Sequence, residues 1–231
     1  MNAEILAYQE AHPGDLVGLD KLAFEYTGKH LVASVRGKGN NLSAAAAQRA
    51  EAESVAEVEA TACTGGIPNF SVTIEAVSLA GPPDLKRVTG RWNFPDCWAG
   101  QRTPEDIASL QFLMADCFRM GAHSISTYSV SGRNTYRGTL RTANVASKAP
   151  IWNVADYTTN FESQADHGGA GVTISDYCGG THQVGTSFDY EANGGNSSVT
   201  GVSAGWGFLS ISYGGSMMKK QLGSPSLYFN L

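Results

Sequence analysis

The chain has 231 residues, of which 16% are charged and 27 are glycine. That length can bury a sizeable core, and the glycine content favours strands and turns over a helical bundle. The formal net charge of −5 argues against a nucleic-acid partner, because proteins of that class carry a basic face.

Residues 1–17 lack the basic start and apolar run of a signal peptide. No stretch approaches the roughly 20 apolar residues of a transmembrane helix. We therefore expect a protein that is made soluble and that stays in the cytoplasm or leaves it by a route that needs no signal peptide.

The segment from Ala44 to Ala62 combines two patterns. Alanine is abundant up to Ala52, which favours a helix, whereas polar and small apolar residues alternate from Glu51 onward, which favours a strand. Three interpretations stay open: one helix throughout, a helix followed by a strand, or a segment that switches between the two.

Two strands are predicted next. Apolar residues alternate with polar ones from Phe70 to Leu79 and again from Val88 to Phe94. The intervening Gly81-Pro82-Pro83-Asp84 is typical of a turn. The pattern predicts two antiparallel strands, each with one apolar face.

A helix is predicted from Pro104 to Met120. Thr103 supplies an N-cap, proline suits the first helical position, and acidic residues follow in the first turn. Apolar residues then recur at helical spacing as far as Gly121. They are Ile107, Leu110, Leu113, Met114, Cys117 and Phe118. We expect this apolar face to pack on an antiparallel sheet.

A hairpin is predicted from Ile125 to Val130 and from Thr135 to Val145. Arg133, Arg137 and Arg141 recur at a spacing of four, which places them on one face of a strand. Such a row predicts a site for an anion or a partner, either a phosphate, an anionic lipid surface or an acidic neighbouring subunit. The alternative is a solvated face or a salt-bridge ladder.

The C-terminal part is rich in paired glycines and has no Lys or Arg from Ala149 to Met218. Short alternating runs, such as Leu209–Tyr213, predict an antiparallel meander. The predicted fold class is therefore β-rich α+β, with an antiparallel sheet, one amphipathic helix and a Gly-rich C-terminal β-meander. We expect a single domain over residues 1–231, and the alternative is a division into 1–148 and 149–231.

Cys178-Gly-Gly-Thr-His182 places a thiol and an imidazole four residues apart, close enough to share a metal ion across a tight turn. The string resembles the Cys-Gly-Gly-Thr-His stretch of alanyl-tRNA editing domains, and this resemblance implies part of a zinc site at Cys178 and His182. The chain lacks the His-x-x-x-His that supplies the other two ligands in that family. The alternative is a buried cysteine beside a turn histidine, and we predict that no cofactor is bound.

The cysteines are widely spaced and form no Cys-x-x-Cys pair. They are Cys63, Cys97, Cys117 and Cys178. We expect reduced, mostly buried thiols, because a chain of this length folds without disulfides.

Asp189, Glu191 and Asn193 alternate before Gly194, as the first oxygen ligands of a calcium-binding loop do. The bidentate glutamate expected at the twelfth position of such a loop is replaced by Thr200. The alternative is the polar edge of a strand that enters a turn.

Thr181-His182, followed by Gly194-Gly195, resembles the Gly-Thr-His … Gly-Gly signature of perforin-like pore formers. The alternation of small residues from Ser203 to Tyr213 resembles that family too, although the spacing between the two parts differs. The resemblance implies strands that insert into a membrane.

Three functions follow from these observations. The favoured hypothesis is a non-enzymatic protein that self-associates as a homo-oligomer, the subunit of a shell, tube, ring or pore-like assembly. The first alternative is a membrane-active pore former that inserts β-strands as a barrel, with Trp206, Phe208, Leu209 and Ile211 toward lipid. The second is a small metal-dependent or Cys/His hydrolase, for which the sequence holds no established nucleophile motif.

Self-association is predicted to use opposite charges. The acidic residues of the base-free segment would meet Arg133, Arg137 and Arg141 of a neighbouring subunit and set the register of the assembly. They are Asp156, Glu162, Asp166, Asp176, Asp189 and Glu191.

Overall fold

The computed structural model describes residues 8, 12, 18, 21–22, 25, 31–38, 67, 70–79, 85–95, 105–156, 158–159, 162–163, 165–180, 182–195, 198–214, 217–224 and 226–231. From residue 67 onward, every regular element in these ranges is a β-strand. The chain is therefore β-rich, and its sheets are antiparallel. The ambiguous segment 44–62 lies outside the described residues, as do Cys63 and Cys97.

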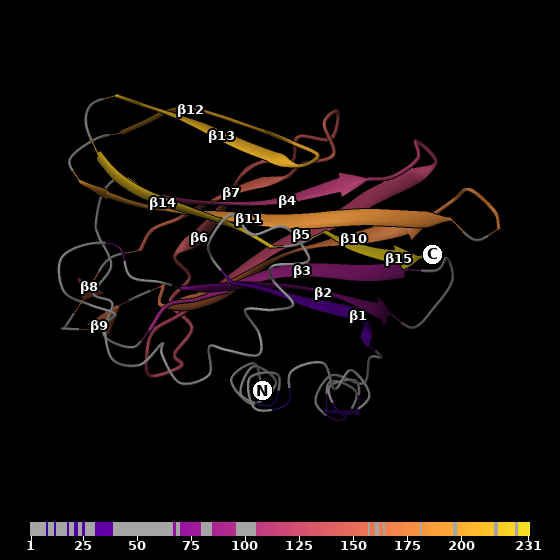
Figure 1. The fold of residues 1–231 in the computed structure, drawn as a ribbon, viewed down its shortest axis with the longest axis horizontal. Helices are drawn as coiled ribbons and strands as arrows, with labels where there is room; N and C mark the ends of the chain where they lie inside the picture. Colours follow the sequence, from indigo (N-terminus) through magenta and orange to yellow (C-terminus); the bar gives the residue numbers. More distant parts are fainter. Residues whose placement is uncertain are drawn as a thin grey trace.

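Two antiparallel sheets pack face to face (Figure 1). Sheet A has five strands in the order β1–β2–β3–β10–β5. Their bounds are Leu31–Lys38 (β1), Ser71–Leu79 (β2), Leu85–Asn93 (β3), His167–Asp176 (β10) and Phe118–Tyr128 (β5).

Sheet B has six strands in the order β14–β11–β4–β7–β6, and β15 pairs with β11 beside β14. Their bounds are Met217–Gly223 (β14), Gln183–Gly195 (β11), Asp106–Leu113 (β4), Ile151–Val154 (β7), Gly138–Thr142 (β6) and Leu227–Asn230 (β15). Two separate strand pairs complete the described fold. They are Ser198–Gly205 (β12) with Phe208–Gly214 (β13), and Thr158–Thr159 (β8) with Glu162–Ser163 (β9).

β2 and β3 confirm the two strands predicted between Phe70 and Phe94. They pair antiparallel, with Ile74 opposite Gly90. Away from Ser78 and Lys86, which are partly exposed, their even-numbered side chains face sheet B and are fully buried, as the alternation predicted. The buried side chains are Val72, Ile74, Ala76, Val88 and Trp92.

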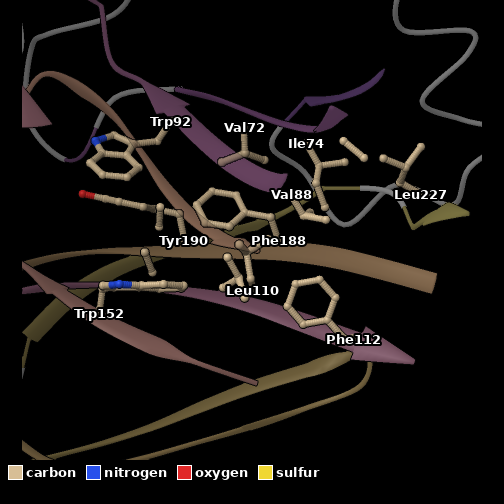
Figure 2. Close-up of a cluster of buried hydrophobic side chains, with 14 of the residues drawn as sticks. Val72, Ile74, Val88, Trp92, Leu110, Phe112, Trp152, Phe188, Tyr190 and Leu227 are labelled. Carbon is tan, nitrogen blue, oxygen red and sulfur yellow. The ribbon is translucent and has the colours of Figure 1, made fainter. Parts of the chain in front are cut away.

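The core lies between the two sheets (Figure 2). Phe188 and Tyr190 project from β11 toward β2 and β3, and Leu110 of β4 is buried beside them. Gly90 supplies the space for the Phe188 ring, because a Cβ at position 90 would overlap that ring. The Trp92 indole packs against Tyr190 with ring centroids 4.8 Å apart.

The helix predicted from Pro104 to Met120 is wrong, because Asp106–Leu113 is strand β4 and Phe118 begins β5. All but the last residue of β4 are buried, since sheet A covers one face and the β12–β13 hairpin covers the other. A strand buried on both faces loses the alternation that identifies strands, and its apolar run then fits a helical stripe equally well. Phe112, which is not among the residues of the predicted helical stripe, is buried on the core face of β4.

The hairpin predicted from Ile125 to Val145 is also wrong in its pairing. β5 pairs with β10 in sheet A, whereas β6 pairs with β7 in sheet B. An isolated bridge between Tyr128 and Asn134 closes the turn that follows β5. The predicted strands of the C-terminal meander are confirmed. Only β12 and β13 pair as consecutive strands of the meander, because β10 belongs to sheet A, and β11 pairs with β4, β14 and β15.

Candidate functional site

The β12–β13 hairpin forms a two-stranded sheet of its own, and neither strand pairs with any other described strand. Figure 1 shows it as a separate layer over sheet B. Trp206 and Gly207 form its turn, where Gly207 has a φ of 77° that suits glycine. No charged residue occurs from Ser198 to Gly214.

The two faces of the hairpin differ in chemistry. One face packs on sheet B through Val199, Val202, Ala204, Leu209 and Ile211. The other face exposes hydroxyl side chains, namely Ser198, Thr200, Ser203, Ser210 and Ser212, and also Phe208 at its turn end, which was predicted to lie toward lipid with Leu209 and Ile211. Beneath the apolar face lie Ile107, Ala149 and Ile151, which are buried and form a cluster with it. The hairpin is therefore amphipathic and uncharged.

The hairpin continues the register of the ladder from which it arises. β11 and β14 end their ladder with Gly195 opposite Met217. One-to-one pairing of the next two residues on each side would lead to Ser198 opposite Gly214, which is the first pair of the β12–β13 ladder. The first pairs of the β12–β13 ladder are thus in register with the β11–β14 ladder, and a bulge between Val199 and Gly201 shifts the register further along the hairpin.

Tyr213 holds the base of the hairpin to β11. Its hydroxyl contacts the carboxylate of Glu191 and lies 2.6 Å from Oδ1 of Asn193, and both of these residues are buried. Burial and the bond to Glu191 raise the pKa of Tyr213 well above its usual range. The hydroxyl therefore stays protonated and remains a hydrogen-bond donor.

Gln111 holds the turn of the hairpin. This fully buried side chain of β4 accepts at Oε1 from the Gly207 amide and from the Ser187 hydroxyl, both at 3.0 Å. Its amide nitrogen donates to the carboxylate of Asp189. The turn is thus tied to sheet B through one side chain and not through a β-ladder.

Two more side chains bond main-chain oxygens of the hairpin. Nδ2 of Asn144 donates to the Ala204 carbonyl at 3.3 Å, and Nε2 of Gln221 donates to the Leu209 carbonyl at 3.3 Å. Side-chain bonds and apolar contact are therefore the described attachments of the hairpin to sheet B.

The tip of the hairpin rests above Gly185. A Cβ at Gly185 would lie 3.0 Å from Cη2 of Trp206 and 2.9 Å from Cε1 of Tyr228. Leu113, Phe208 and Tyr228 are about half exposed around this point (50%, 52% and 50%). An exposed apolar patch therefore surrounds the tip.

Buried carboxylates lie beneath the base of the hairpin. Asp106 accepts hydrogen bonds from the Tyr190 hydroxyl at 2.8 Å and from the Asn193 amide at 2.7 Å. Burial raises the pKa of Asp106 well above its usual range, and the charges of Asp156 and Glu191 raise it further. Burial also raises the pKa of Asp189, and this effect exceeds that of the hydrogen bond from Gln111, which lowers the pKa.

A consequence for stability can be measured with Asp106→Asn. A carboxyl group whose pKa is raised in the folded state favours folding while it is protonated, and this contribution is lost as the pH rises above its unfolded value of about 4. We expect the free energy of unfolding of the native chain to fall as the pH increases from about 4 toward the raised pKa that Asp106 has in the folded state. The free energy of unfolding of Asp106→Asn should fall less over the same range.

Urea denaturation at a series of pH values gives this comparison. The difference between the two proteins isolates Asp106 from Asp116, whose pKa is lowered by the hydrogen bond and charge of Lys148 and which therefore acts in the opposite sense. Parallel pH profiles for the native chain and the variant would contradict the assignment.

The predicted zinc residues are placed at the end of β10. Cys178 forms a disulfide with Cys117, with their Cα atoms 5.1 Å apart, so the expectation of reduced thiols is wrong for this pair. Nε2 of His182 lies 2.9 Å from the Gly179 carbonyl oxygen. In the described ranges, no group of three or more His, Cys, Asp or Glu side chains is arranged to hold a metal ion.

The predicted calcium residues share one face of β11 beneath the hairpin. Asp189, Glu191 and Asn193 are engaged by Gln111 and Tyr213, as described above. They belong to a 13-residue strand and not to a loop. The Tyr213 hydroxyl bonds both Oε1 of Glu191 and Oδ1 of Asn193, and calcium binding by the three residues stays a prediction.

The three arginines of the predicted anion site do not share a strand face. Arg133 is exposed in the turn after β5, Arg137 precedes β6, and Arg141 lies within β6, where it donates to Oδ1 of Asn153 at 3.2 Å. Tyr136 has a φ of 54°, which interrupts the extended backbone that the prediction assumed. Anion binding by these residues stays a prediction.

Sequence reasoning singled out the apolar residues of the hairpin but missed the side chains that hold it. Gln111 was assigned to a helix, and Asn144 and Gln221 carried no motif. The available signal was a glutamine inside a near-continuous apolar run, because buried polar side chains need a hydrogen-bonding partner.

No family model and no curated protein matches the chain. Among solved structures, it is similar to a pore-forming protein (6% identity, 88% of this chain and 91% of the other, TM-score 0.36) and to Clostridium perfringens delta-toxin (7%, 87% and 87%, TM-score 0.34). It is also similar to the Clostridium perfringens NetB toxin in its membrane-inserted form (7%, 86% and 94%, TM-score 0.25).

Within the described ranges, none of the helical residues belongs to a helix that is long and apolar enough to cross a membrane.

Proposed function

We propose that this chain is a membrane-active, pore-forming protein that releases the β12–β13 hairpin from sheet B and inserts it into a bilayer as several copies self-associate. The observation that carries the proposal is the hairpin itself. It is uncharged and amphipathic, and it is attached to sheet B without a β-ladder. Membrane-spanning strands need this alternation, with apolar side chains toward lipid and polar ones toward the water-filled interior.

The continuous register supplies the necessary length. β12 and β13 alone have eight and seven residues, whereas a strand that crosses a bilayer needs about 9–11. Pairing that continues from Gly195 opposite Met217 would give each strand about ten residues before the turn. The sandwich would keep its own ladders in this extended form.

The backbone supplies the reason for self-association. Within a bilayer every main-chain amide and carbonyl must be paired, because lipid offers no hydrogen bonds. An isolated hairpin pairs only its inner edges, so hairpins of neighbouring copies are needed to pair the outer edges. Homo-oligomerisation is therefore part of the proposed mechanism and not a separate function.

Release of the hairpin breaks few hydrogen bonds. The described attachments involve Asn144, Gln111, Gln221 and Tyr213, and each hydrogen bond contributes about 0.5–1.5 kcal/mol net. The hairpin would exchange its apolar contact with Ile107, Ala149 and Ile151 for contact with lipid, and these three side chains would be uncovered on the sandwich. The hairpin can therefore detach without breaking a β-ladder to either main sheet.

The favoured sequence hypothesis, assembly through opposite charges, has less support. Asp156, Asp166 and Glu191 are at most 2% exposed and cannot meet a neighbouring subunit without rearrangement. The hydrolase alternative has less support too, because the thiol of Cys178 is bonded to Cys117. Since disulfides persist in oxidising compartments, the Cys117–Cys178 bond favours export over a cytoplasmic location.

Trp206 gives a direct test, because it lies at the turn that would enter the bilayer first. Vesicles with brominated acyl chains should quench part of the tryptophan fluorescence as an encapsulated dye is released. Trp206→Phe is the matched control, made in a Trp98→Phe background so that Trp98 adds no quenched component. It should lose the quenched component, since Trp92 and Trp152 are fully buried. If dye were released but the quenching did not depend on Trp206, insertion of this hairpin would be contradicted. If vesicles of every composition kept their dye, the proposed function itself would be contradicted.

A further inference from the structure

A separate feature lies on the outer face of sheet A, across the sandwich from the hairpin. Odd-numbered residues of β3 and β10 face outward here, because the even-numbered ones face the core. β3 contributes Arg87 and Arg91, and β10 contributes Gly169 and Gly171 beside them. A Cβ at Gly171 would lie 2.9 Å from Nη2 of Arg87, so the side chain lies across a strand that has no side chain there.

The two arginines have different partners. Arg91 forms a salt bridge with Glu75 of β2. Arg87 reaches across β10 and donates to the hydroxyl of Ser124 on β5. Among the described residues, no carboxylate lies within salt-bridge distance of Arg87. Two guanidinium groups thus share one nearby carboxylate, which leaves one positive charge unmatched.

Arg87 is held in an unfavourable electrostatic position. Partial burial lowers its pKa, and the like charge of Arg91 lowers it further, while Glu75 only partly offsets them. The guanidinium nevertheless stays charged at neutral pH, since its ordinary pKa lies above 12. An anion bound here would relieve this strain.

Hydroxyl groups surround the unmatched charge. Ser124 and Thr89 flank Gly171 on the neighbouring strands, and Ser126 lies opposite Gly169. Oγ1 of Thr89 would lie 3.1 Å from a Cβ at Gly171, so it borders the same space as Arg87. A guanidinium beside several hydroxyl donors suits an oxyanion with several acceptor oxygens.

We propose that Arg87, with the hydroxyls of Ser124 and Thr89, forms a binding site for a phosphate group above Gly171. The phosphate belongs either to a free phosphate ion or to a lipid headgroup, whose recognition chemistry is the same. The site lies on the other sheet from the hairpin and does not depend on pore formation.

Calorimetric titration with inorganic phosphate, at an ionic strength kept constant with chloride, tests the free-ion source. Arg87→Gln should weaken binding about tenfold or more, because a charge-assisted bond is lost. Arg119→Gln is the matched control, since it removes one exposed arginine from the same face of sheet A and should change affinity less than twofold. Ser124→Ala keeps both arginines and should weaken binding several-fold.

Sedimentation with vesicles tests the lipid source. The probes are vesicles of phosphatidylcholine, vesicles that add phosphatidylglycerol, and vesicles that add oleate at equal charge. Two results together would assign the site to lipid phosphate. The native chain should bind phosphatidylglycerol vesicles but not oleate vesicles, and its affinity for phosphatidylglycerol vesicles should fall about tenfold in Arg87→Gln. The proposal would be overturned if Arg87→Gln and Arg119→Gln lost equal affinity. It would also be overturned if Arg87→Gln folded normally and bound phosphate and vesicles as tightly as the native chain.

Discussion

Replacing Phe188 with alanine should lower the free energy of unfolding by about 3–5 kcal/mol, because a fully buried aromatic ring at the centre of the sandwich is removed. The ring lies over Gly90, so the cavity would open between β11 and β3 (Figure 2). Urea denaturation followed by tryptophan fluorescence gives the measurement. A loss below about 1 kcal/mol would contradict this packing of the two sheets.

A double-mutant cycle makes the test specific to the contact. Gly90→Ala should be destabilising by about 1–3 kcal/mol alone, since its new methyl group would overlap the Phe188 ring. Combined with Phe188→Ala, the methyl group enters the cavity, so the two losses should sum to more than the loss of the double variant. Additive losses would mean that the two residues do not touch.

Replacing Ile211 with lysine should abolish dye release from vesicles. Ile211 lies at the middle of β13 on the apolar face of the hairpin, which is the face that would meet lipid. A lysine at the bilayer midplane costs about 2–4 kcal/mol for each strand, and every copy in the pore would carry this cost. Dye release at several lipid-to-protein ratios gives the measurement.

Two control variants separate insertion from folding. Ser212→Lys adds the same charge one residue further on, on the hydroxyl face, and should retain release and shift the pore toward anions. Ile211→Thr loses the same apolar contact as Ile211→Lys without adding a charge, and should also retain release. If Ser212→Lys failed and Ile211→Lys remained active, the assignment of the two faces would be reversed.

The strands with one solvated face could be predicted from the sequence, and those covered on both faces could not. β2 and β3 alternate clearly, so the buried faces of both strands followed from period two, although β3 begins at Leu85, three residues before the predicted strand. β4 is covered by sheet A and by the hairpin, and its apolar run, together with Thr103 and Pro104, suggested a helix. Local preference for a helix start was overridden by tertiary burial, which no local pattern encodes.

Part of the candidate site was also within reach of the sequence. The alternation from Ser203 to Tyr213 predicted membrane-competent strands, and it falls on β12 and β13. The packing of these strands on sheet B could not be predicted, because it depends on the hydrogen bond between Gln111 and Gly207, which are 96 residues apart in the sequence. The Cys117–Cys178 pairing and the approach of Arg87 to Ser124 likewise depend on which strands become neighbours in space.

The chemistry of the two hairpin faces has a thermodynamic consequence. On insertion, the apolar face would exchange a protein surface for lipid tails, and the hydroxyl face would exchange bulk water for the water of the pore. Ile107, Ala149 and Ile151, which the hairpin covers, would be uncovered to water, so release should carry a positive heat-capacity change that scales with their apolar area. Before insertion, the hairpin and these side chains cover each other, so neither apolar surface needs a separate protective partner.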